Sequence, residues 1–599
     1  MSNKKLSLVF GTLIIASMLL TACGGVQEVV VTVEVPGGVE EVVVTATPEE
    51  GGPGPVTLRT YDTSDIPELD PQLATDTTSV DYIENLFVAL TNYDLETSEI
   101  VPEAATAWTI SDDGLTYTFT IRTDIPWVNH NPVTGETVQE TDADGNPLFL
   151  TANDFVYGIK RACDPAIGSY YSSIIAPQIA GCLDVLQYED PEAVPAELVD
   201  AIGVSAPADD TLVIELAFPA GYFLSMTPMW PLIATPQWAI EEHGDNWVEA
   251  GNIVSNGRYV LNEWVHGVRR EIVRNPLMPA DMAGSGNIDV WVTNVVPDSS
   301  TGYALWLNNE VETSGIPAAE LEAHLGQFPD ETMQIADLAV FYIEFAHDKE
   351  PFDDAQVRRA FSAAFDRETF VNEVYQGQGL PMRHFAPPGI FGAPPIDEVG
   401  VGFDPEFAAE QLAAAGYPNC EGFPQVTLLG YSGQGPLNWI EFAQANWSEN
   451  LGCSTDLIQV EQQSFADLLA ATSANTPTAD RFHMWTLGWG PDYADENNWV
   501  GDVLWCEGDN RENRPCTDED DLIVEARQET DPVRRIELYR QIEEGFFGPE
   551  GEMPFAPLYV RIAFVANHSW YERIPALFGG DQIYHASIDQ AAQLAAMGG

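Results

Sequence analysis

The strongest structural pattern in the chain is in Leu338–Tyr375, LAVFYIEFAHDKEPFDDAQVRRAFSAAFDRETFVNEVY. It opens with the apolar run Leu338–Phe345, which is rich in aromatic and β-branched residues and predicts a buried strand. A proline ends that pattern, and Asp353 followed by Gln356 predicts the capped start of a helix. Asp366 precedes a second apolar stripe at helical spacing. We therefore expect a buried strand followed closely by two helices.

Length and composition point to a large acidic protein with more than one domain. The chain has 599 residues, 45% of them hydrophobic, which is ample for sizeable cores. Its net charge is −69, from 93 acidic and 24 basic residues. Such a surface argues against nucleic acid as a partner, because binding to phosphates needs clustered basic side chains. The charge fits either attraction of cationic ligands or an acidic coat that keeps the protein soluble, and we favour the coat.

The first residues predict a lipoprotein leader. Lys4 and Lys5 precede an apolar run that is too short to span a membrane, which is typical of a signal peptide over Met1–Ala22. The run ends in Leu-Thr-Ala-Cys, which is similar to a bacterial lipobox and implies cleavage before Cys23 and a lipid on its sulfur. The alternative is an ordinary secretory leader followed by an unrelated cysteine. We expect an extracytoplasmic protein that is anchored to the membrane through Cys23.

Six cysteines remain after Cys23, an even number in an oxidising compartment. None of them forms a CxxC motif, so structural disulfides are expected rather than a zinc or redox site. Several pairings are possible. The simplest is the nearest-neighbour set, which closes three loops within single segments: Cys163–Cys182, Cys420–Cys453 and Cys506–Cys516.

A tether is expected between the leader and the folded part, over residues 23–55. It contains a degenerate valine-rich repeat, VQEVVVTVEVP and then VEEVVVTATP, followed by Glu, Gly and Pro. The valine runs have strand propensity but too little length to build a core, so we predict a stretched linker.

Several strings along the chain resemble one known family. Besides the opening stretch, these are P-x-x-A-x-x-W-x-x-S-x-D-G-x-x-Y-x-F from Pro102 to Phe119 and D-P-x-x-A-x-x-x-L-x-x-A-G-Y from Asp404 to Tyr417. Together they resemble the peptide- and nickel-binding solute-binding proteins that feed ABC importers, known as family 5. Arg258 departs from the family pattern, since the chain has N-G-R-Y where N-G-P-Y is usual.

The resemblance implies an α/β fold with two lobes, like that of periplasmic binding proteins, with mixed sheets and hinge strands. It implies a first lobe over 56–337, with 96–209 as an extra inserted subdomain. The second lobe would cover 338–552, and 553–599 would return to the first lobe. The family's function is to capture a ligand between the lobes and deliver it to membrane permease subunits. We expect hinge closure without catalysis, no cofactor or metal, and a monomer.

The candidate ligand site lies in His483–Trp499, HMWTLGWGPDYADENNW. Met484–Leu487 predicts a strand, and the loop behind it carries W-G-P-D-Y, which resembles the W-x-x-D-Y of the family's peptide binders. By that resemblance Asp492 takes the peptide's α-ammonium and Trp489 forms a cleft wall, with Gly490 and Tyr493 in the same site. A carboxylate in a closing cleft makes a strong charge-assisted hydrogen bond with an ammonium.

Strand backbone beside this loop can pair with a peptide of any sequence. Asp495-Glu496 departs from the Asp-Pro that often follows in the family, which leaves the course of the loop open.

Two other functions stay open beside oligopeptide binding, which we favour. Some family members bind cello- or other oligosaccharides by stacking sugar rings on aromatic residues, and tryptophans are available in the second lobe: Trp439, Trp447, Trp489 and Trp499. A secreted hydrolase is the other alternative, although the chain lacks HExxH, GxSxG and GxxxxGK[ST]. Ligand recovered unchanged from the pure protein would argue against hydrolysis.

Overall fold

The computed structural model describes residues 27–35, 38–46, 54–431, 438–508 and 510–598. The leader and Cys23 lie outside this part of the chain. The chain divides into two units, 1–54 and 55–599. In the first unit, β1 (Gln27–Val35) pairs antiparallel with β2 (Gly38–Ala46) along their whole length. The two valine repeats therefore form a hairpin instead of the stretched linker that we predicted, because each valine run has the other as a partner strand.

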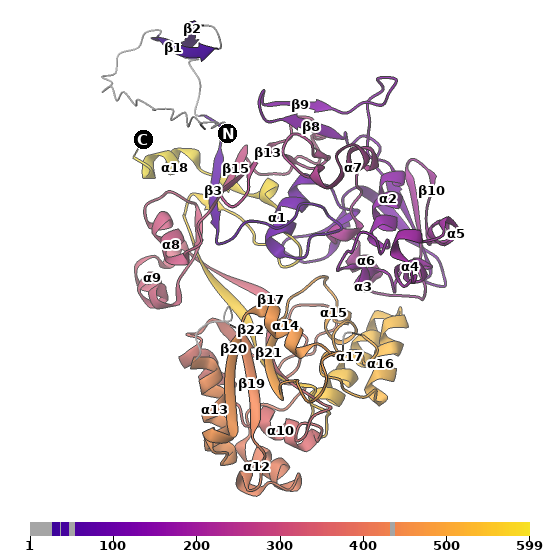
Figure 1. Cartoon of the computed structure of the whole chain (residues 1–599), viewed down its shortest axis with the longest axis vertical. Coiled ribbons are helices and arrows are strands. Elements are labelled where there is room, and N and C mark those ends of the chain that lie inside the picture. The colour runs from indigo at the N-terminus through magenta and orange to yellow at the C-terminus, as the bar shows by residue number, and fades with distance from the viewer. Residues whose placement is uncertain (1–26, 36–37, 47–53, 432–437, 509, 599) are drawn as a thin grey trace, which may run out of the picture. The chain divides into compact units, whose positions relative to one another are not determined.

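The second unit contains two large hydrophobic cores, which define two lobes (Figure 1). The first core gathers side chains from Leu58–Trp291 and again from Tyr571–Ile588. The second gathers side chains from Leu338–Phe578. Two tyrosines are exchanged between the cores: Tyr493 packs in the first and Tyr93 in the second. Each lobe therefore contributes one aromatic side chain to the interior of the other.

The first lobe is built on small sheets. A four-stranded sheet has the order β13 (Tyr259–Val265), β14 (Arg269–Arg274), β15 (Val290–Val295) and β3 (Thr57–Asp62), in which β3 and β15 are parallel. A second has the order β10 (Val204–Ala208), β11 (Thr211–Glu215), β7 (Thr116–Ile121) and β6 (Ala105–Ile110), and a third β12 (Val254–Ser255), β8 (Val128–Asn131) and β9 (Glu136–Gln139). Two short pairs join β4 (Thr91–Tyr93) to β5 (Ile100–Pro102) and β23 (Tyr571–Glu572) to β24 (Ser587–Ile588).

Helices cover these sheets: α1 (Thr77–Leu86), α2 (Ala152–Ala162), α3 (Ser172–Ile175), α4 (Cys182–Leu186), α5 (Ala196–Asp200), α6 (Phe223–Met226), α7 (Gln237–His243), α8 (Ser299–Leu307), α9 (Leu321–Gln327) and α18 (Gln590–Ala596). Within the described residues, none of the helices combines the length and the apolar composition that crossing a bilayer requires.

The second lobe is built on one mixed sheet with the order β16 (Thr313–Gly315), β22 (Phe555–Asn567), β17 (Thr332–Phe345), β21 (Met484–Trp489), β19 (Val426–Tyr431) and β20 (Ile458–Gln463), with β18 (Gly379–Pro381) beside β22. β19 is parallel to β20 and β21, whereas β17 is antiparallel to β21 and β22. The lobe's helices are α10 (Ala355–Ala363), α11 (Arg367–Thr369), α12 (Pro405–Ala414), α13 (Asn438–Leu451), α14 (Phe465–Thr472), α15 (Asn497–Val500), α16 (Asp518–Gln528) and α17 (Pro532–Phe547). The expected two-lobed α/β fold with mixed sheets is confirmed.

The antiparallel pair β17 and β22 runs from one lobe into the other (Figure 1). Leu338–Phe345 lies in β17 and is buried throughout, as predicted for the crossing strand. The pairing register shifts between Ala336 and Val340, and Leu338 within this break has a left-handed φ of 53°. A bulky residue in that conformation and a bulge both mark a point where a strand bends.

The first helix after the crossing strand begins one residue later than predicted. Asp354, and not Asp353, is its N-cap and accepts a 2.8 Å hydrogen bond from the Gln356 N–H. The reason is the preceding turn, in which the N–H of Asp353 donates to the carbonyl of Lys349. Asp366 caps the second helix as expected, with its carboxylate accepting from the Thr369 N–H.

Two arginines of α10 lie off its apolar stripe and are nevertheless buried. Arg358 Nη2 donates to the carbonyl of Glu552 at 2.7 Å, and Arg359 Nη1 donates to that of Gly551 at 2.7 Å. Guanidinium groups can be buried when backbone carbonyls satisfy their donors. These bonds therefore attach α10 to the chain segment that leads into β22.

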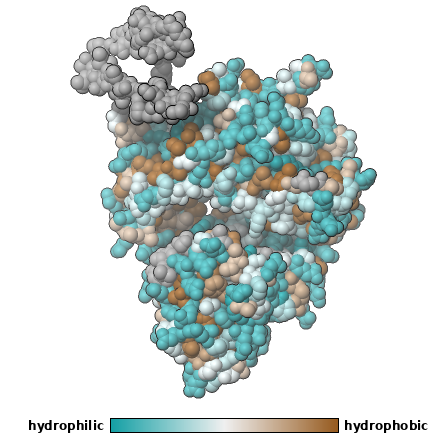
Figure 2. All heavy atoms as spheres, viewed as in Figure 1, coloured by the Kyte–Doolittle hydropathy of each residue, from teal (hydrophilic) through white to brown (hydrophobic). Residues whose placement is uncertain are grey.

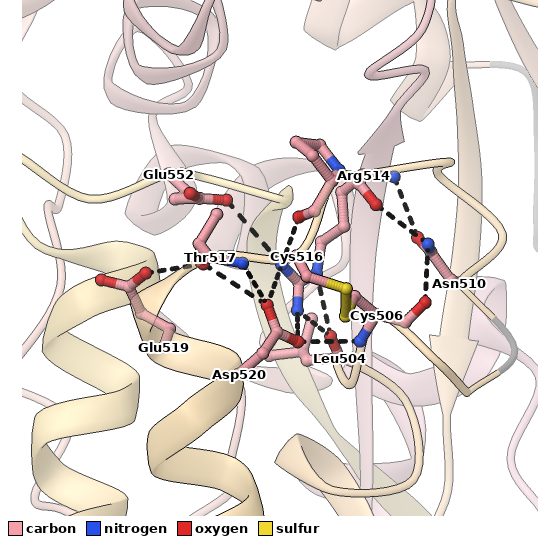
Figure 3. Close-up of a disulfide and its surroundings, with 10 residues drawn as sticks. Leu504, Cys506, Asn510, Arg514, Cys516, Thr517, Glu519, Asp520 and Glu552 are labelled. Carbon is pink, nitrogen blue, oxygen red and sulfur yellow. Dashed lines mark hydrogen bonds and ion pairs between the residues drawn. A yellow bond between two sulfur atoms is a disulfide. The ribbon is translucent and has the colours of Figure 1, made fainter.

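Three disulfides join the nearest-neighbour pairs: Cys163–Cys182, Cys420–Cys453 and Cys506–Cys516. Figure 3 shows the last of these beside Arg514, whose Nη1 donates to Asp520 Oδ2 at 2.9 Å. The ligand atoms of Cys506, Cys516 and Asp520 lie within 4.8 Å of one another. The two sulfurs are bonded to each other, so they offer no thiolate to a metal ion.

Candidate functional site

The predicted W-G-P-D-Y loop leaves the second-lobe sheet at the end of β21, where Trp489 is paired with Val340 of β17. Trp489 is half-buried against the second core, and its Nε1 lies 3.4 Å from Asn498 Oδ1. Gly490 is exposed, and a Cβ added there would meet no atom within 4 Å. The structure therefore shows no steric reason for a glycine at this position.

Asp492 is half-buried, and three polar contacts hold it in place. Its carboxylate accepts hydrogen bonds from Asn498 Nδ2 at 3.0 Å and from Tyr171 Oη at 2.9 Å. Its own N–H donates to Asn498 Oδ1 at 2.9 Å. Tyr171 belongs to the first lobe, so this carboxylate lies between the two lobes.

Burial raises the pKa of Asp492 to about 6. The hydrogen bonds from Asn498 and Tyr171 offset part of this effect, and the nearby charge of Asp502 adds to it. Removing water from a carboxylate disfavours its charged form. A cationic group placed here would therefore stabilise the ionised carboxylate more than it would at an exposed site.

Tyr493 does not line an open surface. It is fully buried in the first core, and its ring stacks on that of Tyr222 with centroids 6.0 Å apart. Its hydroxyl donates to Asp502 Oδ2 at 2.6 Å and accepts from Asn497 Nδ2 at 2.7 Å. In this conformation the side chain fastens the loop to the first lobe.

Asp495, where the sequence departs from the family pattern, forms a buried ion pair. Arg535 Nη2 on α17 lies 2.5 Å from its Oδ1 and 2.6 Å from its Oδ2, and the Tyr539 hydroxyl donates to Oδ1 at 2.9 Å. Although burial alone would lower the pKa of Arg535, the charge of Asp495 raises it above its ordinary value. The pair fixes the end of the candidate loop against α17.

Sequence reasoning missed Tyr171 and Asn498, the two side chains that hydrogen-bond the Asp492 carboxylate. Tyr171 lies 321 positions before Asp492, and no motif marks it. Asn498 lies inside the quoted stretch, but an asparagine at this spacing is not a recognised binding signature. Only folding brings the three together.

Two of the four tryptophans that were considered for a sugar site cannot contact a ligand in this conformation. Trp447 and Trp499 are fully buried in the second core, and Trp447 Nε1 donates to the carbonyl of Phe361 at 2.8 Å. The side chain of Trp439 lies outside the described residues. A sugar ring could not stack on Trp447 or Trp499 in this conformation.

One serine–histidine contact bears on the hydrolase alternative. Ser285 Oγ lies 3.0 Å from His585 Nδ1 at a cavity of about 330 Å³ that Asp94 also lines. In serine hydrolases a carboxylate orients the imidazole. Here Asp94 Oδ1 accepts hydrogen bonds from the N–H and hydroxyl of Thr97 and from the N–H of Glu96, and among the described residues no hydrogen bond joins Asp94 to His585. The contact does not have the arrangement of a catalytic triad.

Comparison with known proteins gives consistent matches. The sequence model of the family described as bacterial extracellular solute-binding proteins, family 5 Middle, matches residues 99–510. The periplasmic oligopeptide-binding protein OppA of Escherichia coli (strain K12) is 26% identical over 496 residues, which cover 82% of this chain and 84% of that protein. The probable deoxycholate-binding periplasmic protein YgiS of the same strain is 28% identical over 505 residues, 83% of this chain and 86% of that protein.

Among solved structures, that of the Escherichia coli murein tripeptide binding protein MppA superposes with a TM-score of 0.71 at 23% identity. The match covers 89% of this chain and 99% of that one. At this level of identity, the superposition supports the fold.

Proposed function

This chain belongs to family 5 of the bacterial extracellular solute-binding proteins, and from that premise we propose that it captures oligopeptides between its lobes and delivers them to an ABC importer. The observation that carries the ligand class is the half-buried carboxylate of Asp492, held between the lobes by Asn498 and Tyr171. A desolvated carboxylate in that position suits a peptide α-ammonium. The relatives include oligopeptide-binding proteins, which supports the same choice.

The proposed mechanism is hinge closure without catalysis. β17 and β22 would act as the hinge, with the bend at the register break around Leu338. In this proposal the first lobe covers 56–337 and 553–599, with 96–209 as its inserted subdomain, and the second lobe covers 338–552. Figure 2 shows a hollow between the lobes on the face in view. A ligand that binds the closed form better than the open form shifts the population toward closure.

The ligand class can be tested by calorimetry on the purified protein. We expect a free-amine tripeptide to bind and its N-acetylated form to bind poorly, because acetylation removes the charge that Asp492 would meet. Cello-oligosaccharide and deoxycholate serve as the competing probes, the second because of the probable deoxycholate-binding relative. Binding of a sugar or of deoxycholate, with indifference to the peptides, would overturn the peptide assignment. Mass spectrometry of ligand carried through purification gives an independent identification.

The lipid anchor is also part of the proposal, since Cys23 lies outside the described residues. We predict a diacylglyceryl group on Cys23, because the leader ends in Leu-Thr-Ala-Cys. Each of its two acyl chains adds binding free energy with every methylene that it buries in the bilayer, and two chains together give stable anchoring. Cys23→Ser should therefore move the protein from the membrane fraction to the soluble fraction after cell fractionation. Unchanged partitioning of that variant would show that another feature holds the protein at the membrane.

A further inference from the structure

The first lobe contains a cavity that does not include any residue of the Asp492 site. Its volume is about 680 Å³, and it is lined by residues of α2, α4, α5 and α7, which Figure 1 shows together in the first lobe. All the lining residues fall within 68–247. Cavities of about 300–1,000 Å³ are typical of small-molecule sites. This cavity is therefore a candidate for a second ligand site.

The walls of the cavity are held by a disulfide and by buried polar contacts. Cys163 at the end of α2 is bonded to Cys182 at the start of α4, and both are fully buried. On another side, Asp70 accepts hydrogen bonds from Arg161 Nη1 and Nη2, both at 2.6 Å, and from Trp247 Nε1 at 3.0 Å. Asp70, Arg161 and Trp247 all line the cavity. These bonds give the cavity a fixed shape and balance the charge of Arg161.

Much of the cavity wall is apolar. Branched aliphatic side chains line it from several segments of the first lobe: Leu73, Ile167, Val185, Val194, Val199 and Ile240. Apolar surface of a ligand that enters would be removed from water against these side chains, which is favourable. The wall therefore suits a ligand that has an apolar group.

Lys160 is the other basic residue of the cavity wall, and it has no counter-charge of its own. It lies on α2 and is half-buried, and within the described residues its ammonium makes neither a hydrogen bond nor an ion pair. A charged hydrogen bond is stronger where the surrounding apolar wall limits access of water. Lys160 can therefore bind an anionic group of a ligand, such as a carboxylate.

Acidic side chains line the same cavity without neutralising Lys160. Glu68 Oε1 accepts hydrogen bonds from the next two N–H groups of the chain, both at 2.8 Å, and Asp164 Oδ1 accepts one from the Ala166 N–H at 2.9 Å. Asp245 is exposed at the cavity. Burial raises the pKa of Glu68, so a cation beside it would stabilise its ionised form. The wall thus presents positive and negative groups that do not pair with each other.

We propose that this cavity binds a free α-amino acid with an apolar side chain, such as leucine. Lys160 binds the carboxylate of the ligand, Glu68 and Asp164 face its ammonium, and the aliphatic side chains pack against its apolar group. A simple anion would lie near the unmatched carboxylates, and a simple cation would leave Lys160 unmatched. A zwitterion meets both charges. The inference does not depend on the proposed function, because no residue of the Asp492 site takes part.

The ligand class can be tested by isothermal titration calorimetry with four matched compounds. Leucine should bind. N-acetylleucine lacks the ammonium, leucinamide lacks the carboxylate and glycine lacks the apolar group, so each should bind at least about tenfold more weakly. Equal binding of any of the three would show that the corresponding contact is not made and would overturn the proposal. Failure of leucine to bind would overturn it as well.

Substitutions show where leucine binds. Lys160→Met keeps most of the stem and removes the charge, so the affinity for leucine should fall about ten- to a hundredfold with little change in Tm. Arg540→Met is the matched control, because it removes a positive charge from an exposed ion pair with Glu398 in the second lobe, and it should leave the affinity unchanged. An affinity that falls in Asp492→Asn, and not in Lys160→Met, would place leucine between the lobes and overturn the inference.

Photochemical labelling of the native protein gives a test that needs no variant. Photo-leucine carries a diazirine in its side chain and keeps both charges. After irradiation, peptide mapping should find the label in segments that line the cavity, such as 157–167 and 185–199, and an excess of leucine should prevent this labelling. Labelling confined to 484–499 or to other segments outside the cavity, or labelling that leucine does not prevent, would overturn the proposal.

Discussion

Asp492→Asn is expected to weaken the binding of free-amine peptides about ten- to a hundredfold. A hydrogen bond to a charged group contributes about 1.5–3 kcal/mol, and about 1.4 kcal/mol corresponds to a factor of ten in affinity. The substitution keeps the shape of the side chain and removes its charge. Isothermal titration calorimetry with matched free-amine and N-acetylated peptides measures the effect, and the acetylated peptides should hardly distinguish the two proteins.

The same carboxylate predicts how peptide binding depends on pH. Its pKa in the free protein is about 6, so it is ionised and able to hold an ammonium above pH 6. Below pH 6 protonation competes with the ligand, and the affinity should fall about tenfold for each pH unit. Asp492→Asn should flatten most of this profile.

Asp502 is the other carboxylate that faces Asp492, and burial raises its pKa as well. The Asp502→Asn variant is therefore the control for the part of the profile that remains. An equally steep fall in Asp492→Asn would assign the pH dependence to Asp502 or to another group.

Removing the Asp492 charge should not weaken the fold. Its folded-state pKa of about 6 lies above the ordinary value for an aspartate. The ionised form therefore costs stability above pH 6, and this cost is relieved as the pH falls through 6. Thermal unfolding at pH 7 should show that Asp492→Asn has a Tm equal to or above that of the native protein. A large decrease in Tm would show that the loss of binding comes from misfolding.

Asp495→Ala is expected to destabilise the protein by about 3–5 kcal/mol, because it leaves the Arg535 guanidinium buried without its counter-charge. Both side chains are at most 4% exposed, and the carboxylate oxygens lie 2.5 and 2.6 Å from Arg535 Nη2. Urea or thermal unfolding under non-reducing conditions measures the loss. Peptide binding should weaken as a consequence, since Asp495 fixes the end of the loop that carries Asp492.

Two controls separate the buried pair from a general effect of losing a charge. Glu537→Ala removes an acid on the same helix whose ion pair with Arg534 is exposed, and it should change the stability little. The double substitution Asp495→Ala with Arg535→Met should recover part of the loss, because no buried charge then remains unpaired. A double variant as unstable as Asp495→Ala alone would contradict this account of the pair.

The fold class and the crossing strand could be predicted because they depend on local pattern. An eight-residue run rich in aromatic and β-branched side chains is typical of a buried strand, and Leu338–Phe345 forms such a strand. Helix caps were predictable to within one residue, as the choice between Asp353 and Asp354 shows. That choice depended on a hydrogen bond to Lys349, which is a property of the folded turn.

Other features depended on which segments meet in space. Trp447 and Trp499 were candidates for a sugar site, but packing in the second core buries both. Arg358 and Arg359 of α10 are buried as well, with hydrogen bonds to backbone carbonyls far along the chain. Within the described residues the two valine repeats pair with each other as antiparallel strands. The need to build a hydrophobic core does not predict this pairing.

The candidate site also has one part that local pattern predicts and another that depends on which segments meet in space. Local sequence was enough to identify the carboxylate, since W-G-P-D-Y at a strand end places Asp492 on a loop whatever surrounds it. The contacts of that carboxylate depend on how the chain folds: Tyr171 comes from the other lobe, 321 positions away, and Tyr493 packs in the first core. Hydrogen bonds and burial of this kind are made between surfaces that exist only after both lobes have folded. For that reason local pattern could identify the charged group, and the contacts between the lobes determined its pKa and its neighbours.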